Sequence, residues 1–452
     1  MTIKTIILAA GKGSRMKSKV PKVLHKLAGK PMLQWVVEAA KGLGSETIVV
    51  YGHGGEQVKE SLPSFELSWV EQVEQLGTGH AVQQASGDIT ADDTVLILYG
   101  DVPLINQTTL QQMLSACDDK TMSLLTVELN DPTGYGRIVR QSTEVEKIVE
   151  QKDASAEELL ITEVNTGILA LKGALLTTCL AALKNDNAQQ EYYLTDIIEM
   201  AVNAGVRIDT IQPANEFEVQ GVNSTSQLNQ LERYQQGLYA EFVMQQGVTL
   251  ADAARFDLRG EVMELGTDIF IDCNVILAGE ISLGSNVSIA ANCVITNAVI
   301  EDNVSIKAHS VLDDCHIGAG SDVGPFARIR PGTKLGCDTK VGNFVEMKKT
   351  TLGAGSKVSH LSYIGDADIG KEVNIGAGTI TCNYDGVNKY KTTIADGAFI
   401  GSDTQLVAPV SVGENATIAA GTTLTKDAPD GVLTLSRAKQ MTLKNWKRSN
   451  KE

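Results

Sequence analysis

The 452-residue sequence has few aromatic side chains, 5% in total, and a deficit of positive charge, with 39 Lys and Arg against 55 Asp and Glu. The formal net charge of −16 argues against nucleic acid as the main partner. Seven cysteines are scattered singly without a Cys-x-x-Cys pair, which argues against a disulfide framework and a zinc site. No apolar run approaches the length of a membrane-spanning helix, and the one near the N-terminus is too short for a signal peptide. We therefore expect a cytoplasmic protein with neither nucleic-acid nor membrane partners.

Residues 1–223 show the pattern of an α/β domain. Three apolar, β-branched segments, residues 5–9, 47–51 and 94–98, are typical of strands buried on both faces. Helical segments such as residues 32–41 lie between them. The alternation predicts a Rossmann-like α/β domain with a mostly parallel sheet and helices on both faces.

Residues 224–247 predict one long amphipathic helix that links two domains. Apolar side chains recur there at steps of three and four residues, at Leu228, Leu231, Tyr234, Leu238 and Phe242. Residues 248–452 then form the second domain.

The second domain has a period of six residues. Each hexad is one short strand and one tight turn, and three hexads make one triangular coil of a parallel β-helix. A helix is excluded because six is not a helical period and β-branched residues dominate. The repeated aliphatics are Leu277, Leu283, Ile289, Ile295, Ile300, Ile306, Leu312, Ile317, Val323, Ile329, Leu335, Val341, Ile394, Ile400, Leu406, Val412, Ile418 and Leu424.

One segment, residues 381–393, interrupts the repeat and cannot continue the aliphatic ladder. We expect it to project from the coil as a loop. A tolerated insertion is the alternative, but its Asn, Tyr and Lys content favours a binding role.

The first predicted strand runs directly into a glycine-rich turn. Gly11 and Gly13 allow backbone N–H groups to approach an anion, and Arg15 and Lys22 add positive charge. We expect a helix to start here and to add its dipole. An ordinary strand–helix turn is the alternative, and the spacing matches neither a Walker loop nor the dinucleotide fingerprint.

This segment resembles the signature of the sugar-nucleotide pyrophosphorylases, Leu-x-x-Gly-x-Gly-Thr-x-Met-x4-Pro-Lys, with Ser14 in place of the threonine. The resemblance implies a nucleotidyltransferase that uses UTP and Mg²⁺, with Arg15 and Lys22 as catalytic cations and Asp101 and Asn223 as metal ligands. The nucleotide- and sugar-binding positions that it implies are Leu8, Ala9, Ala10, Gly11, Lys22, Gln72, Gly77, Thr78, Tyr99, Gly100, Asp101, Gly136, Glu150, Asn165 and Asn223, with uracil at Gln72, Gly77 and Thr78.

These residue types suit nucleotidyl transfer. A sugar-phosphate oxygen attacks the α-phosphorus of a nucleoside triphosphate and pyrophosphate leaves, so charge must be spread over Mg²⁺, Lys and Arg. Mg²⁺ takes few protein oxygens and completes its shell with waters and phosphates, which suits one Asp and one Asn. By itself Asp101 at a strand end is also consistent with a turn former, but its Tyr-Gly-Asp-Val-Pro context favours a metal ligand.

Two basic residues and one histidine stand out between the hexads. Arg330 and Lys348 are 18 residues apart, which is one coil, so we expect them to stack on one face and hold a sugar phosphate. His360 lies 12 residues further, on a different face or at a corner, and a shared pocket then needs a neighbouring subunit or the loop. Histidine is the natural general base near neutral pH. A structural histidine and solvated surface charge are the alternatives.

This half resembles the left-handed parallel β-helix acyltransferases, which are trimers that bind acetyl-CoA between adjacent coils. The resemblance implies a homotrimer with His360 as the acetyl-transfer base. It also implies sugar-phosphate contacts at Arg330, Lys348, Tyr363 and Asn374, and acetyl-CoA contacts at Ala377, Asn383, Tyr384, Ser402, Ala420 and Arg437.

The two halves and the connector together resemble a family of bifunctional bacterial enzymes over almost the whole chain, notably in residues 341–349 and 376–386. The resemblance implies acetylation of glucosamine-1-phosphate from acetyl-CoA. N-acetylglucosamine-1-phosphate then reacts with UTP to give UDP-N-acetylglucosamine for cell-wall polymers. The rival hypotheses are a β-helix that only trimerises or regulates a nucleotidyltransferase, which His360 and the loop argue against, and a purely structural β-helix, which the phosphate-binding turn argues against. The basic segment 444–448 is consistent with a solvated end or with a contact to CoA phosphates.

Overall fold

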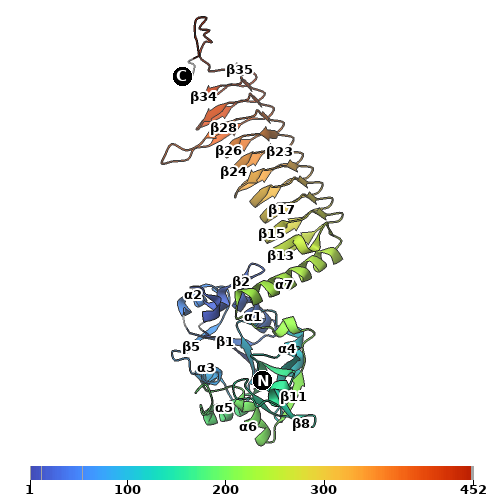
Figure 1. Ribbon diagram of the computed structural model, residues 1–452. Helices are drawn as coiled ribbons and strands as arrows, with labels where there is room; N and C mark the ends of the chain where they lie inside the picture. Colours follow the sequence, from blue (N-terminus) through green and yellow to red (C-terminus); the bar gives the residue numbers. More distant parts are fainter. Residues whose placement is uncertain (1, 12, 53, 449–452) are drawn as a thin grey trace. The chain divides into compact units, whose positions relative to one another are not determined.

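The computed structural model describes residues 2–11, 13–52 and 54–448 (Figure 1). The chain forms two compact units, Met1–Tyr234 and Gln235–Glu452. The boundary between the units lies within α7 (Thr225–Gln245), the long helix that the sequence predicts. The division into residues 1–223, 224–247 and 248–452 stays a prediction.

The first unit is built on one nine-stranded sheet. Its strand order is β11-β7-β10-β6-β1-β4-β5, with β8 paired to β10 and β9 paired to β8. All pairs along this order are parallel except those of β10, so the predicted mostly parallel sheet is confirmed. The strands are β1 (Ile3–Ala9), β4 (Glu46–Tyr51), β5 (Ser68–Glu71), β6 (Thr94–Tyr99), β7 (Thr121–Glu128), β8 (Arg137–Gln141), β9 (Glu144–Val149), β10 (Glu163–Lys172) and β11 (Arg207–Ile211). A two-stranded ribbon is formed by β2 (Lys26–Leu27) and β3 (Lys30–Pro31).

Helices cover both faces of this sheet, because alternate residues of a strand point to opposite sides. Ile6 of β1 packs in a cluster with α3, α5 and α6, whereas its neighbour Ile7 packs in a cluster with α1 and α4. The sheet is therefore the middle layer of three, as the fully apolar strands predict. The helices of this unit before α7 are α1 (Met32–Lys41), α2 (Gly55–Glu60), α3 (Thr78–Ala85), α4 (Gln107–Ala116), α5 (Gly173–Ala182) and α6 (Asp196–Asn203).

Helix α7 does not present the single apolar face that its period predicts. Leu231 is buried in the first unit, and Val243 is buried in the core of the second. Leu238 and Phe242, expected on the buried face, are 43% and 47% exposed. The helix contributes to two separate cores, so its buried face changes along its length.

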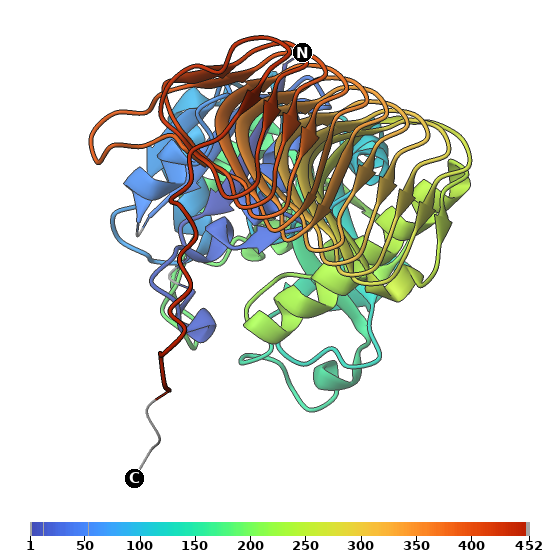
Figure 2. The same ribbon diagram turned by 90° about the horizontal axis from the view of Figure 1, so that it is seen from above.

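The second unit is a parallel β-helix, whose coils are seen from above in Figure 2. Every strand pair that the described residues form in its two large sheets is parallel, and each coil repeats the register of the one before. In one of the two sheets, for example, equivalent positions of successive coils are occupied by Ile289, Ile306, Val323 and Val341. All the predicted ladder aliphatics are at most 4% exposed. The predicted hexad architecture is therefore confirmed.

The strands of this unit fall into two sets. The eleven-stranded sheet contains β12 (Thr249–Leu250), β14 (Phe270–Ile271), β16 (Ser288–Ile289), β18 (Ser305–Ile306), β20 (Asp322–Val323), β23 (Lys340–Asn343), β25 (Lys357–His360), β27 (Asn374–Ile375), β30 (Phe399–Ile400), β33 (Thr417–Ile418) and β35 (Leu433–Thr434). The thirteen-stranded sheet contains β13 (Phe256–Leu265), β15 (Val275–Leu283), β17 (Val294–Ile300), β19 (Val311–Ile317), β21 (Arg328–Ile329), β22 (Thr333–Leu335), β24 (Glu346–Leu352), β26 (Tyr363–Ile369), β28 (Ile380–Cys382), β29 (Thr392–Ile394), β31 (Gln405–Val407), β32 (Val410–Val412) and β34 (Thr423–Leu424).

The interrupting segment leaves the coil between β28 and β29 and projects as a loop, as expected (Figure 1). A bridge between Tyr384 and Lys389 closes it. Thr381 and Thr392, near the two ends of the segment, are 1% and 0% exposed inside the coil, so the projecting part lies between them. No helix in the described part of the chain is both long and apolar enough to cross a membrane.

Candidate functional sites

The glycine-rich turn lies at the carboxyl end of β1. Gly13 has a φ of 60°, and a Cβ on it would meet the Cβ of Lys22 at 2.7 Å, so this position requires glycine. The expected helix start is wrong, because only a three-residue 3-10 turn, Ser14–Met16, follows. The turn therefore presents backbone and side chains to an anion without the dipole of an α-helix.

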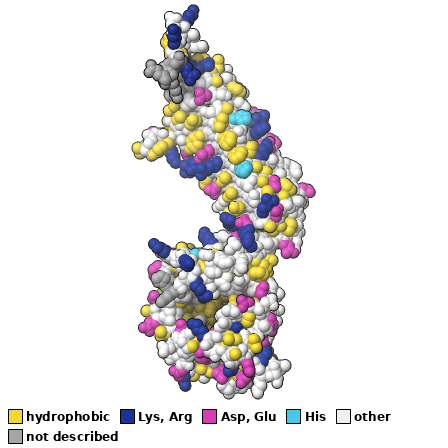
Figure 3. All heavy atoms as spheres, in the orientation of Figure 1, with side chains coloured by type: hydrophobic (Ala, Val, Ile, Leu, Met, Phe, Trp, Pro, Cys, Tyr) yellow, Lys and Arg dark blue, Asp and Glu magenta, His cyan; other side chains and the backbone are white. Residues whose placement is uncertain are grey.

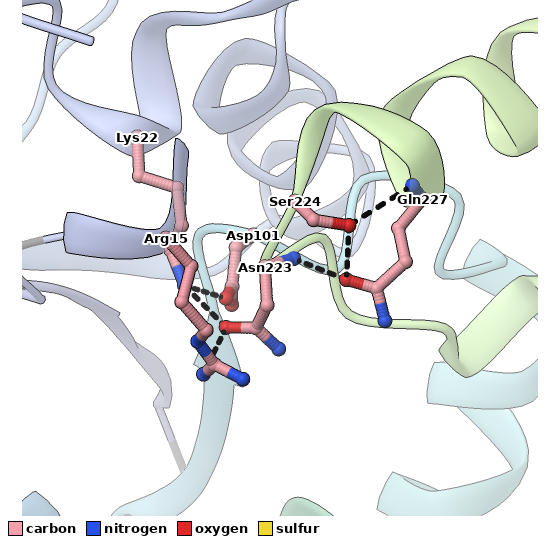
Figure 4. A network of polar contacts seen from close by, with 6 residues as sticks. All are labelled: Arg15, Lys22, Asp101, Asn223, Ser224 and Gln227. Carbon is pink, nitrogen blue, oxygen red and sulfur yellow. Dashed lines mark hydrogen bonds and ion pairs between the residues drawn. The ribbon is translucent and has the colours of Figure 1, made fainter. Parts of the chain in front are cut away.

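Four polar side chains from distant parts of the sequence meet beside this turn (Figure 4). Lys22 forms an ion pair with Asp101, and its Nζ also lies 3.2 Å from Asn223 Oδ1. Arg15 donates to the same Asn223 oxygen at 3.0 Å. Asp101 follows β6 and Asn223 precedes α7, and the hydrogen bond from Val222 N to Asp101 O, 2.9 Å, ties the two segments together. The sequence-predicted metal ligands and catalytic cations therefore share one site.

The donor set fits a hard divalent cation. A carboxylate oxygen and an amide oxygen converge on one ammonium group, which marks a position where both oxygens contact a single cation. The described residues hold no group of three or more His, Cys, Asp or Glu side chains placed for a metal. Two protein oxygens with the remaining ligands from phosphate and water is the pattern typical of Mg²⁺.

The nucleotide-binding positions predicted in residues 8–11 and 99–101 lie at neighbouring strand ends. Gly100 N donates to Leu8 O at 2.9 Å, which places the segment Tyr99-Gly100-Asp101 beside the end of β1. Gln75, a residue that the sequence reasoning did not select, donates through Nε2 to Ala10 O at 2.9 Å. The carbonyl of Ala9 and the N–H of Gly11 belong to the same turn. Parallel strands bring these ends to one edge of the sheet, where α/β proteins bind ligands.

On one side of this turn lie the predicted uracil contacts. Gln72 is 4% exposed and donates through Nε2 to Gly77 O at 3.1 Å. Thr78 begins α3 and accepts a hydrogen bond from Leu194 N at 3.2 Å. Gln72 lines a cavity of about 440 Å³ together with Tyr51, Gly52, Gly54, Gly55, Glu56, Glu71, Val73 and Gln75.

The predicted sugar contacts also come together. Asn165 N donates to Gly136 O at 2.9 Å, and the Asn165 side chain accepts from Gly167 N at 2.9 Å. Glu150 accepts from the Thr195 hydroxyl at 3.1 Å, and burial raises the pKa of its carboxyl group. Burial, with the charges of Glu150 and Asp101, raises the pKa of Tyr99. Burial, and to a smaller extent the nearby carboxylates, therefore keep Tyr99 a neutral hydrogen-bonding group.

Asp196, which follows Thr195, carries a testable pH effect. Burial first, and then the charges of Glu199, Glu150 and Asp153, raise the pKa of Asp196 to about 6. The folded state then binds the proton more tightly than the unfolded chain, so stability falls as the pH rises from the ordinary pKa of aspartate to about 6.

We expect Asp196→Asn to stabilise the first unit at pH 8 by about 1–2 kcal/mol, allowing for solvent screening, and to give no gain at pH 3. Thermal unfolding at both pH values measures this. The control is Asp186→Asn, because Asp186 is an exposed acid that lines a second cavity together with Asp196. A lower melting temperature of Asp196→Asn at pH 8 would contradict the assignment.

In the β-helix, Arg330 and Lys348 lie beside one another on adjacent coils, in agreement with their 18-residue spacing. Ile329 pairs with Met347, and Arg330 N donates to Met347 O at 2.8 Å. Arg330 also forms a 2.7 Å ion pair with Glu346. Figure 3 shows Lys and Arg side chains gathered here beside the projecting loop.

Lys389, in that loop, joins this cluster and was missed from the sequence. The neighbouring Lys389 ammonium is the main cause of the lowered pKa of Lys348, because two close cations repel, and Arg330 adds to the effect. Glu346 neutralises only part of the charge of Arg330, Lys348 and Lys389, and such an excess of positive charge suits a phosphate group. No spacing rule identifies Lys389, because the fold of the loop brings it to Lys348.

His360 lies on a different sheet, as its spacing from Lys348 predicts. It ends β25, its side chain is exposed, and its Nδ1 lies 2.7 Å from Asn343 Oδ1 on the preceding coil. Tyr363 follows on β26, where it stands in the column of Glu346. Asn374 lies on β27 opposite Lys357 of the His360 strand.

The predicted acetyl-CoA contacts divide into two groups. Ala377, Ser402 and Ala420 occupy one corner of successive coils that starts at His360. Gly378 N donates to His360 O at 3.4 Å, Asp403 N to Ala377 O at 2.7 Å and Gly421 N to Ser402 O at 2.8 Å, and Arg437 lies against Gly421. Asn383 and Tyr384 lie instead at the base of the loop, where Asn383 donates to Asp366 and the Tyr384 hydroxyl donates to Gly386 O at 2.6 Å.

The fold and the two sites define a nucleotidyltransferase joined to a hexapeptide-repeat acyltransferase. Residues 5–160 match the MobA-like NTP transferase domain family, and residues 391–426 match the bacterial transferase hexapeptide family, six repeats. The chain is 55% identical over 448 residues to the bifunctional protein GlmU of Marinobacter nauticus, covering 99% of this chain and 98% of that protein. It is also 55% identical over 453 residues to the bifunctional protein GlmU of Methylococcus capsulatus, covering 100% of this chain and 98% of that protein. The chain therefore belongs to the GlmU family, and it is a bifunctional transferase.

Proposed function

We propose that this enzyme makes UDP-N-acetylglucosamine in two steps, acetylating glucosamine-1-phosphate in the β-helix and transferring a uridylyl group in the first unit. The observation that carries the proposal is that each unit holds its own cluster of charged and polar side chains, one suited to a metal ion and phosphates and the other to a sugar phosphate. Asp101 and Asn223 meet Lys22 and Arg15 in the first unit, and Lys348 meets Arg330 and Lys389 in the second. Both proposed co-substrates, acetyl-CoA and UTP, are cytoplasmic metabolites, which supports a cytoplasmic location for the enzyme.

In uridylyl transfer, the phosphate oxygen of N-acetylglucosamine-1-phosphate attacks the α-phosphorus of UTP, a P–O bond forms, and pyrophosphate leaves. Asp101 and Asn223 would hold Mg²⁺, which supplies charge stabilisation to the phosphate oxygens when bound. Lys22 then turns from Asp101 to the phosphates, and Arg15 neutralises the leaving pyrophosphate. Gln72, Gly77 and Thr78 hold the uracil ring, and Gly136, Glu150 and Asn165 hold the sugar.

In acetyl transfer, the amine of glucosamine-1-phosphate attacks the thioester carbon of acetyl-CoA. A C–N bond forms, the C–S bond breaks, and the amine proton passes through His360 to the CoA sulfur. The hydrogen bond from Nδ1 to Asn343 Oδ1 leaves the lone pair on Nε2, the nitrogen that takes the proton. Ala377, Ser402, Ala420 and Arg437 line the path of CoA along the corner that starts at His360, with Asn383 and Tyr384 of a loop completing it.

The acetyl site requires more than one chain in this proposal. His360 and the cation cluster lie on different sheets of one β-helix, so a trimer in which the His360 and Asn374 of one subunit sit beside its neighbour's Arg330, Lys348 and Tyr363 completes the site. Analytical ultracentrifugation of the full chain tests this, with a trimer expected. A monomer with full acetyl-transfer activity would contradict it.

Lys389→Met is expected to raise the KM for glucosamine-1-phosphate about tenfold, because a charge-assisted contact to the phosphate is lost. The kcat changes less, since His360 is untouched. Initial rates of CoA thiol release against glucosamine-1-phosphate concentration measure both constants. Lys391→Met, in the same loop but paired with Asp368, is the matched control. An unchanged KM for Lys389→Met would remove Lys389 from the phosphate site.

The bifunctional assignment itself is tested with purified protein, glucosamine-1-phosphate, acetyl-CoA, UTP and Mg²⁺, following free thiol and pyrophosphate separately. Release of both is expected. Pyrophosphate release only when N-acetylglucosamine-1-phosphate is supplied ready-made, without thiol release, would reduce the β-helix to a scaffold.

A further inference from the structure

The amide of Gln72 is held in one orientation by its neighbours. Its Nε2 lies 3.1 Å from Gly77 O and 3.1 Å from His80 Nδ1, and the side chain is almost fully buried. A backbone carbonyl can only accept a hydrogen bond, so the group that faces Gly77 must be the NH₂ group of the amide. This argument fixes the orientation by chemistry, independently of how the two ends of the amide are assigned.

His80 must therefore accept from Gln72. The same NH₂ group faces His80 Nδ1, so Nδ1 carries a lone pair and the ring proton lies on Nε2. The ring sits beside Tyr192, at 6.3 Å between centroids, and its Nε2 lies 3.1 Å from the exposed side chain of Gln84. The Gln84 amide nitrogen also lies 3.3 Å from His80 O, but Gln84 is exposed and water can replace that contact when its amide oxygen turns to Nε2–H, whereas the buried Gln72 cannot turn in this way.

The consequence concerns the Gln72 oxygen. In the described part of the chain no hydrogen bond to Gln72 Oε1 is formed, and Gln72 lines the cavity of about 440 Å³ next to the glycine-rich turn. Uracil presents an N–H donor at ring position 3, whereas cytosine presents a lone pair there. A fixed amide oxygen therefore accepts from uracil and repels cytosine.

We propose that His80 is a specificity-determining positioning residue. Its Nδ1 lone pair holds the Gln72 amide with Oε1 toward the pyrimidine, and this orientation selects UTP over CTP. The inference rests on the proposed contact between Gln72 and the uracil ring.

The test compares kcat/KM for UTP and for CTP, with N-acetylglucosamine-1-phosphate, in five proteins: the wild type, His80→Leu, His80→Asn, Gln84→Ala and Gln72→Ala. Leucine at 80 has no acceptor, so Gln72 can turn, and the UTP-to-CTP ratio is expected to fall about fivefold to tenfold, the effect of one net hydrogen bond. Asparagine can place Oδ1 where Nδ1 was and should keep the wild-type ratio. Gln84→Ala removes the contacts to the other ring nitrogen and to His80 O, neither of which faces Gln72, and should keep it too. Both nucleotides are measured on one preparation, so any unfolded fraction cancels from the ratio.

The outcomes distinguish the proposed role of His80 from the proposed contact between Gln72 and the uracil ring. A lowered ratio in His80→Leu and Gln72→Ala, with rescue in His80→Asn, supports the inference. A wild-type ratio in His80→Leu beside a lowered ratio in Gln72→Ala overturns the role of His80 and leaves Gln72 as the base contact. A wild-type ratio in Gln72→Ala overturns the base contact itself, and the inference with it.

Discussion

His360→Ala is expected to lower acetyl transfer about 100- to 10,000-fold, the usual contribution of a general base. The reason is local, because the alanine removes the only group proposed to take the amine proton, and Asn343 then has no imidazole to orient. Uridylyl transfer from ready-made N-acetylglucosamine-1-phosphate should stay at the wild-type rate, since His360 belongs to the second unit. Thiol release and pyrophosphate release, measured on the same preparation, give both rates.

His316→Ala is the matched control, because His316 is another half-exposed β-helix histidine, paired with Glu301 and outside the proposed site. It should keep both activities. If His360→Ala kept acetyl transfer within a few-fold of the wild type, His360 would be a surface histidine and the base would lie elsewhere. A pH profile adds a second readout, because the limb that a histidine base gives to kcat/KM should disappear in the variant.

Asp101→Ala is expected to lower uridylyl transfer at least about 100-fold at millimolar Mg²⁺, because the site loses its carboxylate. Lys22 would also lose its ion-pair partner, which leaves Asn223 as its remaining side-chain oxygen. Acetyl transfer should be unchanged. Pyrophosphate release measured over a range of Mg²⁺ concentrations checks the assignment, because a lost ligand shifts the metal dependence to higher concentration.

Asp92→Ala is the control for this variant, because Asp92 is exposed and lies before β6, at the opposite end of the strand from Asp101. It should behave as the wild type. Loss of the folded first unit in Asp101→Ala, seen as a missing unfolding transition, would make Asp101 a structural turn former, the reading that the sequence also allowed. An unchanged Mg²⁺ dependence in a folded, active variant would remove Asp101 from the metal site.

The large-scale organisation was predictable because it follows from burial. Aliphatics such as Ile289 and Ile306 recur at a fixed period, and a fixed period leaves few ways to bury them all. The same holds for β1, where Ile6 and Ile7 are both apolar and therefore both faces of the sheet are covered. The pairing of Arg330 with Lys348 also followed from the period, since one coil separates them.

What the sequence did not predict depends on contacts between distant segments. Leu238 and Phe242 have the spacing of a buried stripe, but α7 serves a different core at each end and exposes them. The helix expected after Gly13 is replaced by a short 3-10 turn. Lys389 lies beside Lys348 and His80 lies beside Gln72, and no local pattern marks a residue whose proposed role depends on such a contact.

The central claim is that one chain carries two independent active sites that catalyse consecutive reactions. Mixing two variants tests this claim most directly. His360→Ala and Asp101→Ala are each incubated alone with glucosamine-1-phosphate, acetyl-CoA, UTP and Mg²⁺, and then incubated together, and UDP-N-acetylglucosamine is quantified. Neither variant alone should form the product beyond a small residue, whereas the mixture should form it readily, because N-acetylglucosamine-1-phosphate released by one protein is used by the other. A mixture as inactive as the separate variants, with both proteins folded, would contradict two independent sites.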